Sequence, residues 1–151
     1  MREPPLLLRP ELAQLVAEGR KTVTRRPLSA RGIGAWRPGD RAYVRETVRG
    51  CASGCVRYLG DRRALPCPHG RERTVPSIHM PRRLARSILE ITSVSRVALG
   101  SLSDSEVQAE GSGSAERFAA RWIETYGAGH SEVWCVAFQL ARQDDLLPLD
   151  S

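Results

Sequence analysis

The spacing of apolar and polar residues along the chain predicts short helices and strands in alternation. Leu12, Leu15 and Val16 follow the i, i+3, i+4 spacing of one helix face. Pro10 suits the first turn of such a helix and Gly19 the position just beyond its end, so we predict a helix over 10–18. Strand patterns are predicted over 22–24, 41–49, 56–59, 86–97 and 133–140, the last of them apolar enough to be buried on both faces.

The C-terminal half of the chain contains two further helix patterns. Ser103 and Glu106 have the spacing of a capping box and predict a helix over 104–110. Aromatic residues recur every fourth position over 115–126, which is typical of a helix that packs an aromatic stripe into a core. Mixed helices and strands indicate an α+β protein, and 151 residues fit a single domain, with a loose tail from about residue 143.

Two local patterns predict how particular segments are stabilised. Glu46 shares the inward face of the strand predicted over 41–49, so we expect it to pair with an arginine. Two prolines in the stretch 75–83 predict an extended segment, with His79 between apolar neighbours. A single histidine in such a place is more often a hydrogen-bonded structural residue than a catalyst.

The positive charge of the chain is carried almost wholly by arginine. Of its 23 basic side chains, 22 are arginine and Lys21 is the only lysine, and the formal net charge of +6 favours a polyanionic partner such as RNA. Unlike a guanidinium, the ammonium of Lys21 can lose its proton, and Arg20, Arg25 and Arg26 favour that loss. A neutral amine could then activate the hydroxyl of Thr24 as a nucleophile. The alternative is a solvated basic turn without catalytic function.

The cysteines and the absence of apolar segments bear on location and metal binding. The sequence has no apolar run of the ~20 residues that span a bilayer, and its start is unlike a signal peptide, so we expect a cytoplasmic protein.

Cys51, Cys55, Cys67 and His69 fall within 19 residues as C-x3-C-x11-C-x-H, four ligands that zinc accepts. This spacing is not a standard zinc signature, so free thiols in a variable loop over about 51–73 are the preferred interpretation, and no cofactor is expected.

Four blocks of sequence, taken in order, resemble the ASCH-domain family and in particular its bacterial and phage-associated branch. They are Gly19-x-Lys21-x-x-Thr24-x-Arg26, Trp36-x-Pro38-Gly39-Asp40-x-x-x-Val44-Arg45-Glu46, Ser77-Ile78-His79-Met80-Pro81-Arg82, and the helix from Leu99 to Glu110-Gly111. The resemblance covers roughly residues 8–142. The loop 51–73 departs from it, because its cysteines and histidine are not part of the family pattern.

The resemblance implies a fold, a substrate class and site residues. It implies a PUA-like fold, a small mixed β-barrel flanked by helices, in a family linked to RNA binding, RNA cleavage and amide hydrolysis of N4-acetylcytidine. In the small amidohydrolase members the catalytic Lys, Thr and Glu correspond to Lys21, Thr24 and Glu110. Contacts to substrate or RNA are expected from Arg20, Arg25, Arg26, Arg45, His79 and Arg82.

The sequence leaves more than one function open. Amide hydrolysis of an N4-acylated cytidine, as free nucleoside or within RNA, is the leading hypothesis. A non-catalytic RNA-binding module and a ribonuclease are the alternatives, and the same cationic residues 19–26 would serve each of them. No membrane and no obligate protein partner is expected.

Overall fold

The computed structural model of the chain describes residues 3–100 and 102–141, so the tail predicted from about residue 143 lies outside the described residues. The three α-helices and eight strands of this described part confirm the α+β class. The strands form two sheets, and within the described residues neither sheet closes into a barrel, which corrects the barrel implied by the family resemblance. No helix in this part of the chain is long and apolar enough to cross a bilayer. The chain divides into two compact units, which are described one at a time.

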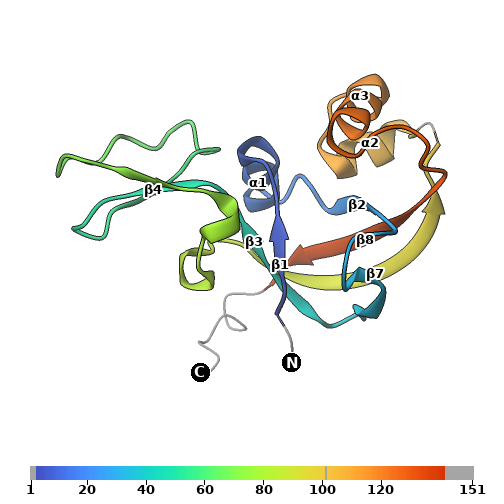
Figure 1. Cartoon of the computed structure of the whole chain (residues 1–151), viewed down its shortest axis with the longest axis horizontal. Coiled ribbons are helices and arrows are strands. Elements are labelled where there is room, and N and C mark those ends of the chain that lie inside the picture. The colour runs from blue at the N-terminus through green and yellow to red at the C-terminus, as the bar shows by residue number, and fades with distance from the viewer. Residues whose placement is uncertain (1–2, 101, 142–151) are drawn as a thin grey trace. The chain divides into compact units, whose positions relative to one another are not determined.

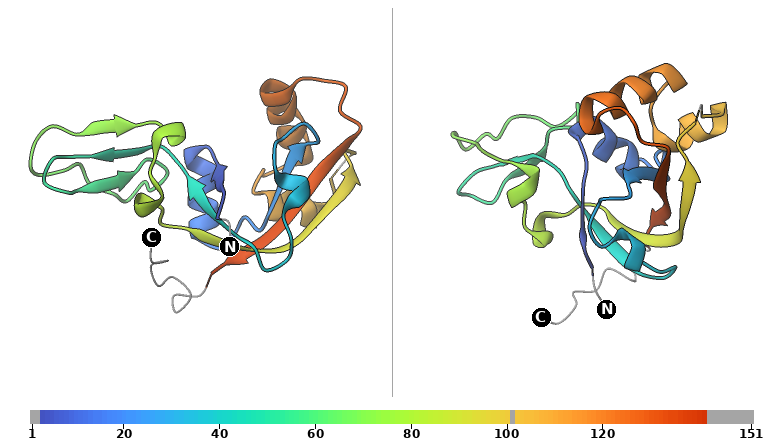
Figure 2. Two further views of the ribbon diagram at one scale, coloured as in Figure 1. Left: turned by 60° about the horizontal axis from the view of Figure 1, so that its bottom comes forward. Right: turned by 45° about the vertical axis from the view of Figure 1, so that its right-hand side comes forward.

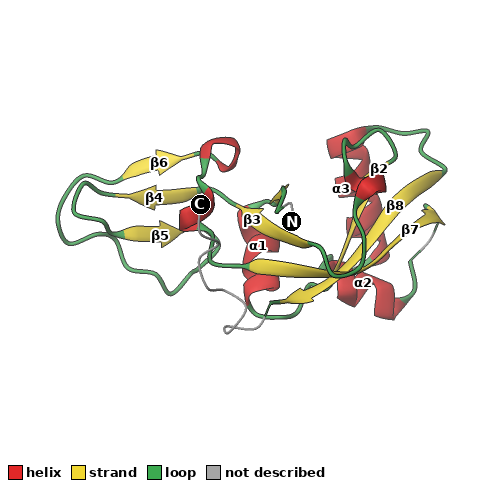
Figure 3. Ribbon diagram, turned by 90° about the horizontal axis from the view of Figure 1, so that it is seen from below, coloured by secondary structure: helices red, strands yellow, loops and turns green. Residues whose placement is uncertain are grey.

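The first unit contains the described residues up to Glu18, residues 41–89, and Leu140 with Ala141. Strand β1 (Pro5–Leu7) pairs in parallel with β3 (Arg41–Arg45), which places Leu6 opposite Val44. Helix α1 (Pro10–Ala17) begins at the proline predicted to start it and buries Ala13 and Val16. The small sheet of this unit, residues 48–75, has β4 (Val48–Gly50) between β5 (Val56–Tyr58) and β6 (Arg73–Val75), both antiparallel to it (Figure 3).

The strand predicted over 41–49 is in fact two strands, because the chain changes sheet at Glu46. β3 ends at Arg45, and β4 begins at Val48. Glu46 is fully buried and accepts two hydrogen bonds from Arg86, at 2.8 Å from Nη2 and 3.0 Å from Nε. The predicted arginine partner is therefore present, and the ion pair lies where the regular alternation of the strand is interrupted.

The segment 75–83 is not extended as predicted. Each of its two prolines precedes a short 3₁₀ turn instead, one over Ser77–His79 and the other over Arg82–Leu84. Proline fixes its own φ near the value that begins a helical turn, so the same residues that suggested an extended chain also permit these turns. Met80 lies between the turns and is completely buried.

The second unit contains residues 19–40 and 90–139. Strand β8 (Glu132–Leu140) lies between β7 (Ile88–Ala98), whose first two residues belong to the first unit, and β2 (Val23–Pro27). β2 and β8 are antiparallel, with Thr24 opposite Val136. Helices α2 (Asp104–Glu110) and α3 (Ala115–Tyr126) lie on one side of these strands (Figure 1 and Figure 2).

Both helices of this unit begin and end as the sequence predicts. Ser103 and Glu106 form the predicted capping box at the start of α2, and Gly111 ends that helix with a φ of 75°. The aromatic stripe of α3 is core: Phe118 and Trp122 are buried and pack against Val133 of β8. β8 is less buried than predicted, because its side chains alternate between buried and half-buried positions and its last two residues are exposed.

Candidate active site

Lys21 is held at the end of helix α2 in the second unit. Only 3% of the residue is exposed. Its Nζ donates hydrogen bonds to the main-chain oxygens of Val23, at 2.7 Å, and Glu110, at 2.8 Å. The last carbonyls of a helix have no partner inside the helix, and a cation beside them is favoured by the helix dipole. Lys21 therefore caps α2, and the main-chain N–H of Thr22 completes the cap by donating to Ala109 O at 2.9 Å.

Burial lowers the pKa of Lys21 from 10.5 to about 8. Removal of the ammonium from water is the largest cause, and the positive charges of Arg26 and Arg121 act in the same direction. The negative charge of Glu110 opposes the shift without cancelling it. The only lysine of the chain is thus a group that exchanges its proton near neutral pH.

The carboxylate of Glu110 lies beside this amine. Its Oε1 is 3.6 Å from Lys21 Nζ and accepts a hydrogen bond from the main-chain N–H of Arg25 at 3.3 Å, while its Oε2 is 3.5 Å from Arg25 Nη1. Arg25 also reaches the start of the same helix, where its Nη2 is 2.8 Å from Glu106 Oε2. Arg25, buried on β2, therefore holds α2 by carboxylates near both ends and fixes Glu110 against the strand.

Thr24 belongs to the same buried group through Arg26. Its residue is 3% exposed, and its Oγ1 accepts a hydrogen bond from Arg26 Nε at 3.3 Å. Within the described residues no hydrogen bond joins Thr24 to Lys21 or Glu110. The structure thus brings Lys21 and Glu110 into direct contact and places Thr24 three residues along the same segment.

Three buried polar atoms of this group make no hydrogen bond among the described residues: Glu110 Oε2 and Arg25 Nη1, which form the ion pair at 3.5 Å, and Arg121 Nη1. A buried donor or acceptor without a hydrogen bond is costly, and a ligand that supplies the missing bond removes that cost. Arg121 was not predicted from the sequence, because it lies on a helix whose aromatic stripe is already explained by the core. Two of the three atoms are guanidinium donors, which suit an oxygen acceptor on a ligand.

The other residues expected to contact RNA or substrate lie outside this group. Arg20 is exposed. Arg45, His79 and Arg82 belong to the first unit, where Arg45 lies over the ring of Tyr43 and Arg82 pairs with Glu3 at 2.7 Å. Arg25, predicted as a binding residue, is engaged by the two carboxylates of α2.

A pocket of about 230 Å³ lies along α3 in the second unit. Phe118, Trp122 and His130 are among its lining residues, and it shares no residue with the group around Lys21.

In the first unit, the ligand atoms of Cys51, Cys55, Cys67 and His69 all lie within 4.8 Å of one another. Three thiols and an imidazole so placed are compatible with a zinc ion, and the free-thiol interpretation of the sequence does not account for their convergence.

Comparisons with known proteins show the fold. Neither a protein-family model nor a curated protein matches the sequence. Among solved structures, the chain is similar to protein EF3133 from Enterococcus faecalis V583, designated DUF984, with a TM-score of 0.52 and 18% identity over 93% of this chain and 82% of that one.

Two ASCH domains are also among the similar structures. One is from Lactobacillus crispatus JV V101, with a TM-score of 0.46 and 17% identity over 85% of this chain and 69% of that one. The other is a mutant form of ZmASCH from Zymomonas mobilis, with a TM-score of 0.46 and 13% identity over 97% of this chain and 79% of that one.

Proposed function

We propose that this chain is an ASCH-type protein that acts on RNA or modified nucleosides, and that it hydrolyses the amide of an N4-acylated cytosine. The observation that carries the proposal is the buried contact between Lys21, whose pKa is about 8, and the carboxylate of Glu110. A titratable amine beside a carboxylate, with a threonine hydroxyl on the same segment, is a set of groups suited to acyl transfer. The family resemblance of the motifs supports the same substrate class.

Lys21 acts as the general base in this proposal. A neutral amine has two N–H groups and one lone pair. The main-chain oxygens of Val23 and Glu110 can take both N–H groups, so the lone pair remains available for a proton. Lys21 removes the hydroxyl proton of Thr24 as its oxygen attacks the acyl carbon. A small side-chain rotation is needed, since catalytic hydrogen bonds often form only with substrate bound.

Glu110 and the arginines act on the amide carbonyl oxygen and on the departing nitrogen. The amide carbonyl becomes an oxyanion during attack, and Arg26, together with the buried Nη1 of Arg121 that makes no hydrogen bond, supplies donors for it. Glu110, 3.6 Å from Lys21, passes the proton from the amine to the departing exocyclic nitrogen. Water then hydrolyses the ester on Thr24, releasing the carboxylic acid and restoring the free hydroxyl.

Turnover of N4-acetylcytidine by purified protein tests the proposal. We expect release of cytidine and acetate by the wild type, and a loss of at least about 10²-fold in kcat/KM for Lys21→Arg and Thr24→Val, because general-base and nucleophilic steps contribute on this scale. Thr22→Val is the matched control, since it makes the same change at an exposed position two residues away. Its turnover should equal that of the wild type.

Thermal unfolding of each variant shows whether the fold is kept. Equal turnover by wild type and Lys21→Arg would remove Lys21 from the role of base. Equal turnover by wild type and Thr24→Val would leave water as the attacking group.

The charge of the chain favours RNA binding without catalysis as the second candidate function. The net charge is +6, and arginines 62, 63, 71 and 73 are all exposed. Phosphate contacts by such residues predict an affinity for RNA that falls steeply with salt concentration. In this case Lys21→Arg binds almost normally, and the wild type does not release acetate from N4-acetylcytidine.

A further inference from the structure

The small sheet of the first unit has almost no hydrophobic core. Val48 at the start of β4 is its only buried residue, and residues 49–79, all of them described by the structure, include none. Its three strands have three residues each, and Leu65 in the loop between β5 and β6 is 84% exposed. A few short strands without a buried apolar face are at best marginally stable in water. Segments of this size are usually stabilised by a disulfide or a metal ion.

Four metal-ligating side chains converge in this same segment. Cys51 follows β4, Cys55 precedes β5, and Cys67 and His69 lie in the loop before β6. All four ligand atoms lie within 4.8 Å of one another, although the sequence separates the first from the last by 18 positions. The group therefore links each strand of the small sheet to its neighbours.

The distances within the cluster approach those of a tetrahedral zinc site. Zinc–sulfur bonds of about 2.3 Å and zinc–nitrogen bonds of about 2.0 Å place sulfur and nitrogen about 3.5 Å apart at the tetrahedral angle. His69 Nδ1 is 3.3 Å from Cys55 Sγ and 3.8 Å from Cys67 Sγ, values on either side of this separation. Three thiols with one imidazole also form a ligand set that selects zinc over the harder divalent cations.

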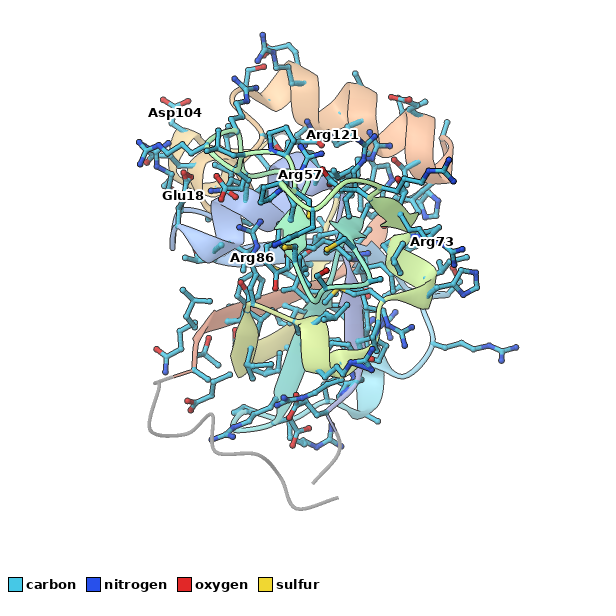
Figure 4. The ribbon with its side chains drawn as sticks, turned by 90° about the vertical axis from the view of Figure 1, so that its left-hand side faces the viewer. Glu18, Arg57, Arg73, Arg86, Asp104 and Arg121 are labelled. Carbon is cyan, nitrogen blue, oxygen red and sulfur yellow. The ribbon has the colours of Figure 1, made fainter. Side chains whose placement is uncertain are left out.

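Hydrogen bonds outside the four ligands hold the loops in place. The main-chain N–H of His69 donates to Cys67 Sγ at 3.3 Å, which fixes the position of this sulfur in the loop. Glu72 accepts a hydrogen bond from the main-chain N–H of Cys67 at 2.9 Å and pairs with Arg57 of β5 at 3.0 Å. This carboxylate therefore connects the ligand loop to β5, whose Arg57 is labelled in Figure 4.

The turn between the first two cysteines is also suited to ligation. The N–H of Gly54 donates to Cys51 O at 3.1 Å, and the N–H of Cys51 donates to Cys55 O at 3.1 Å. Gly54 has a φ of +92°, which other residues rarely adopt, and this conformation lets the chain return within three residues. Both thiols consequently lie on the same turn.

We propose that Cys51, Cys55, Cys67 and His69 bind one structural Zn²⁺ ion that stabilises the small sheet. The ion takes the place of a larger hydrophobic core, because it ties the end of β4, the start of β5 and the loop before β6 to a single point. The site is independent of the catalytic group, whose residues all lie in the second unit.

Metal analysis of the full chain, purified in reducing buffer, tests the proposal. We expect about one zinc per wild-type chain and loss of that zinc in Cys67→Ser. Cys135→Ser is the matched control, because Cys135 is the fourth free cysteine and lies on β8 outside the cluster. It should retain the zinc of the wild type.

Two further measurements apply to the wild type and do not depend on how Cys67→Ser folds. Exchange of the metal for Co²⁺ should give the visible absorption of tetrahedral cobalt with thiolate charge-transfer bands in the near ultraviolet. Removal of zinc by a chelator should accelerate amide hydrogen exchange in β4, β5 and β6 while β2 and β8 keep their protection. A wild type that binds no zinc, or equal loss of zinc in Cys67→Ser and Cys135→Ser, would overturn the proposal. An intact mass showing a disulfide between two of the cluster cysteines in reducing buffer would do so as well.

Discussion

Lys21 should lose its proton near pH 8 in the folded protein and near pH 10.5 in the unfolded chain. The cause is its burial among other cations at the end of α2, which favours the neutral amine. The gap between the two pKa values corresponds to about 3 kcal/mol, at 1.36 kcal/mol for each pKa unit. Because the residue is only 3% exposed, solvent screening reduces this figure little.

The sign of the effect on stability follows from which state holds the proton. Below about pH 8 the amine is protonated in both states, and the unfavourable burial of the charge is fully present. Between about pH 8 and 10.5 the unfolded chain still binds the proton and the folded protein does not, so the free energy of unfolding rises with pH. Above pH 10.5 both states are neutral at this residue, and its contribution is constant again.

The unique lysine makes this prediction directly measurable. Protein labelled with ¹³C-lysine gives one side-chain signal, whose chemical shift should titrate with a midpoint near pH 8. Denaturant unfolding of wild type and Lys21→Met across pH 7 to 11 should show their free energies of unfolding diverging by about 3 kcal/mol in favour of the wild type. Tyrosines and cysteines titrate in both proteins, so their effects cancel in the difference. A midpoint at or above about pH 10, or a difference that does not change with pH, would refute the reasoning.

Two further changes test the fold around the sites. Arg86→Met leaves the fully buried Glu46 without its partner and should lower the free energy of unfolding by about 3 kcal/mol in urea denaturation; an unchanged midpoint would show that the pair contributes no net stability. Gly111→Ala places a side chain at a φ of 75° and should cost about 1 kcal/mol by the same measurement. Gly100→Ala is the control, since Gly100 has no positive φ and no atom within 4 Å of the added carbon, and its loss should be clearly smaller than that of Gly111→Ala.

The sequence predicted the separate parts of the candidate site better than their arrangement. Lys21 stands out from the composition alone because it is the only lysine. The capping box marks the start of α2 and Gly111 its end, so the sequence places Glu110 in the last turn of this helix. On an ideal strand, Lys21 and Thr24 would point to opposite faces, but β2 begins only at Val23, so this alternation does not set the direction of the Lys21 side chain. The contact between Lys21 and Glu110 joins residues 89 positions apart, and no local pattern reports such a contact.

Other features were missed because a local pattern had already been explained in another way. Arg121 lies on a helix that the aromatic stripe assigned to the core, and nothing in its spacing marks its guanidinium as one of the positive charges that lower the pKa of Lys21. The spacing of the cysteines and His69 is not a standard zinc signature. These residues converge only because β4 pairs with β5 and β6, which the spacing does not reveal. Pairings between strands distant in sequence are decided by the whole fold rather than by the residues that form them.

The position of Lys21 is compatible with two roles, a structural one as the cap of α2 and a chemical one in proton transfer. As a cap for the last carbonyl of α2, the side chain would serve best with a permanent charge, because a cation interacts favourably with the helix C-terminus. Arginine, which supplies 22 of the 23 basic side chains, would provide that charge without loss of its proton. Burial instead brings the pKa of this lysine to about 8, so that a fraction of the molecules holds a neutral amine at neutral pH. A fold that needed only the cap would gain nothing from this equilibrium, whereas proton transfer requires it. Lys21→Arg therefore separates the two roles: it should keep the helix cap and the stability of the fold while it lowers kcat/KM for N4-acetylcytidine by at least about 10²-fold.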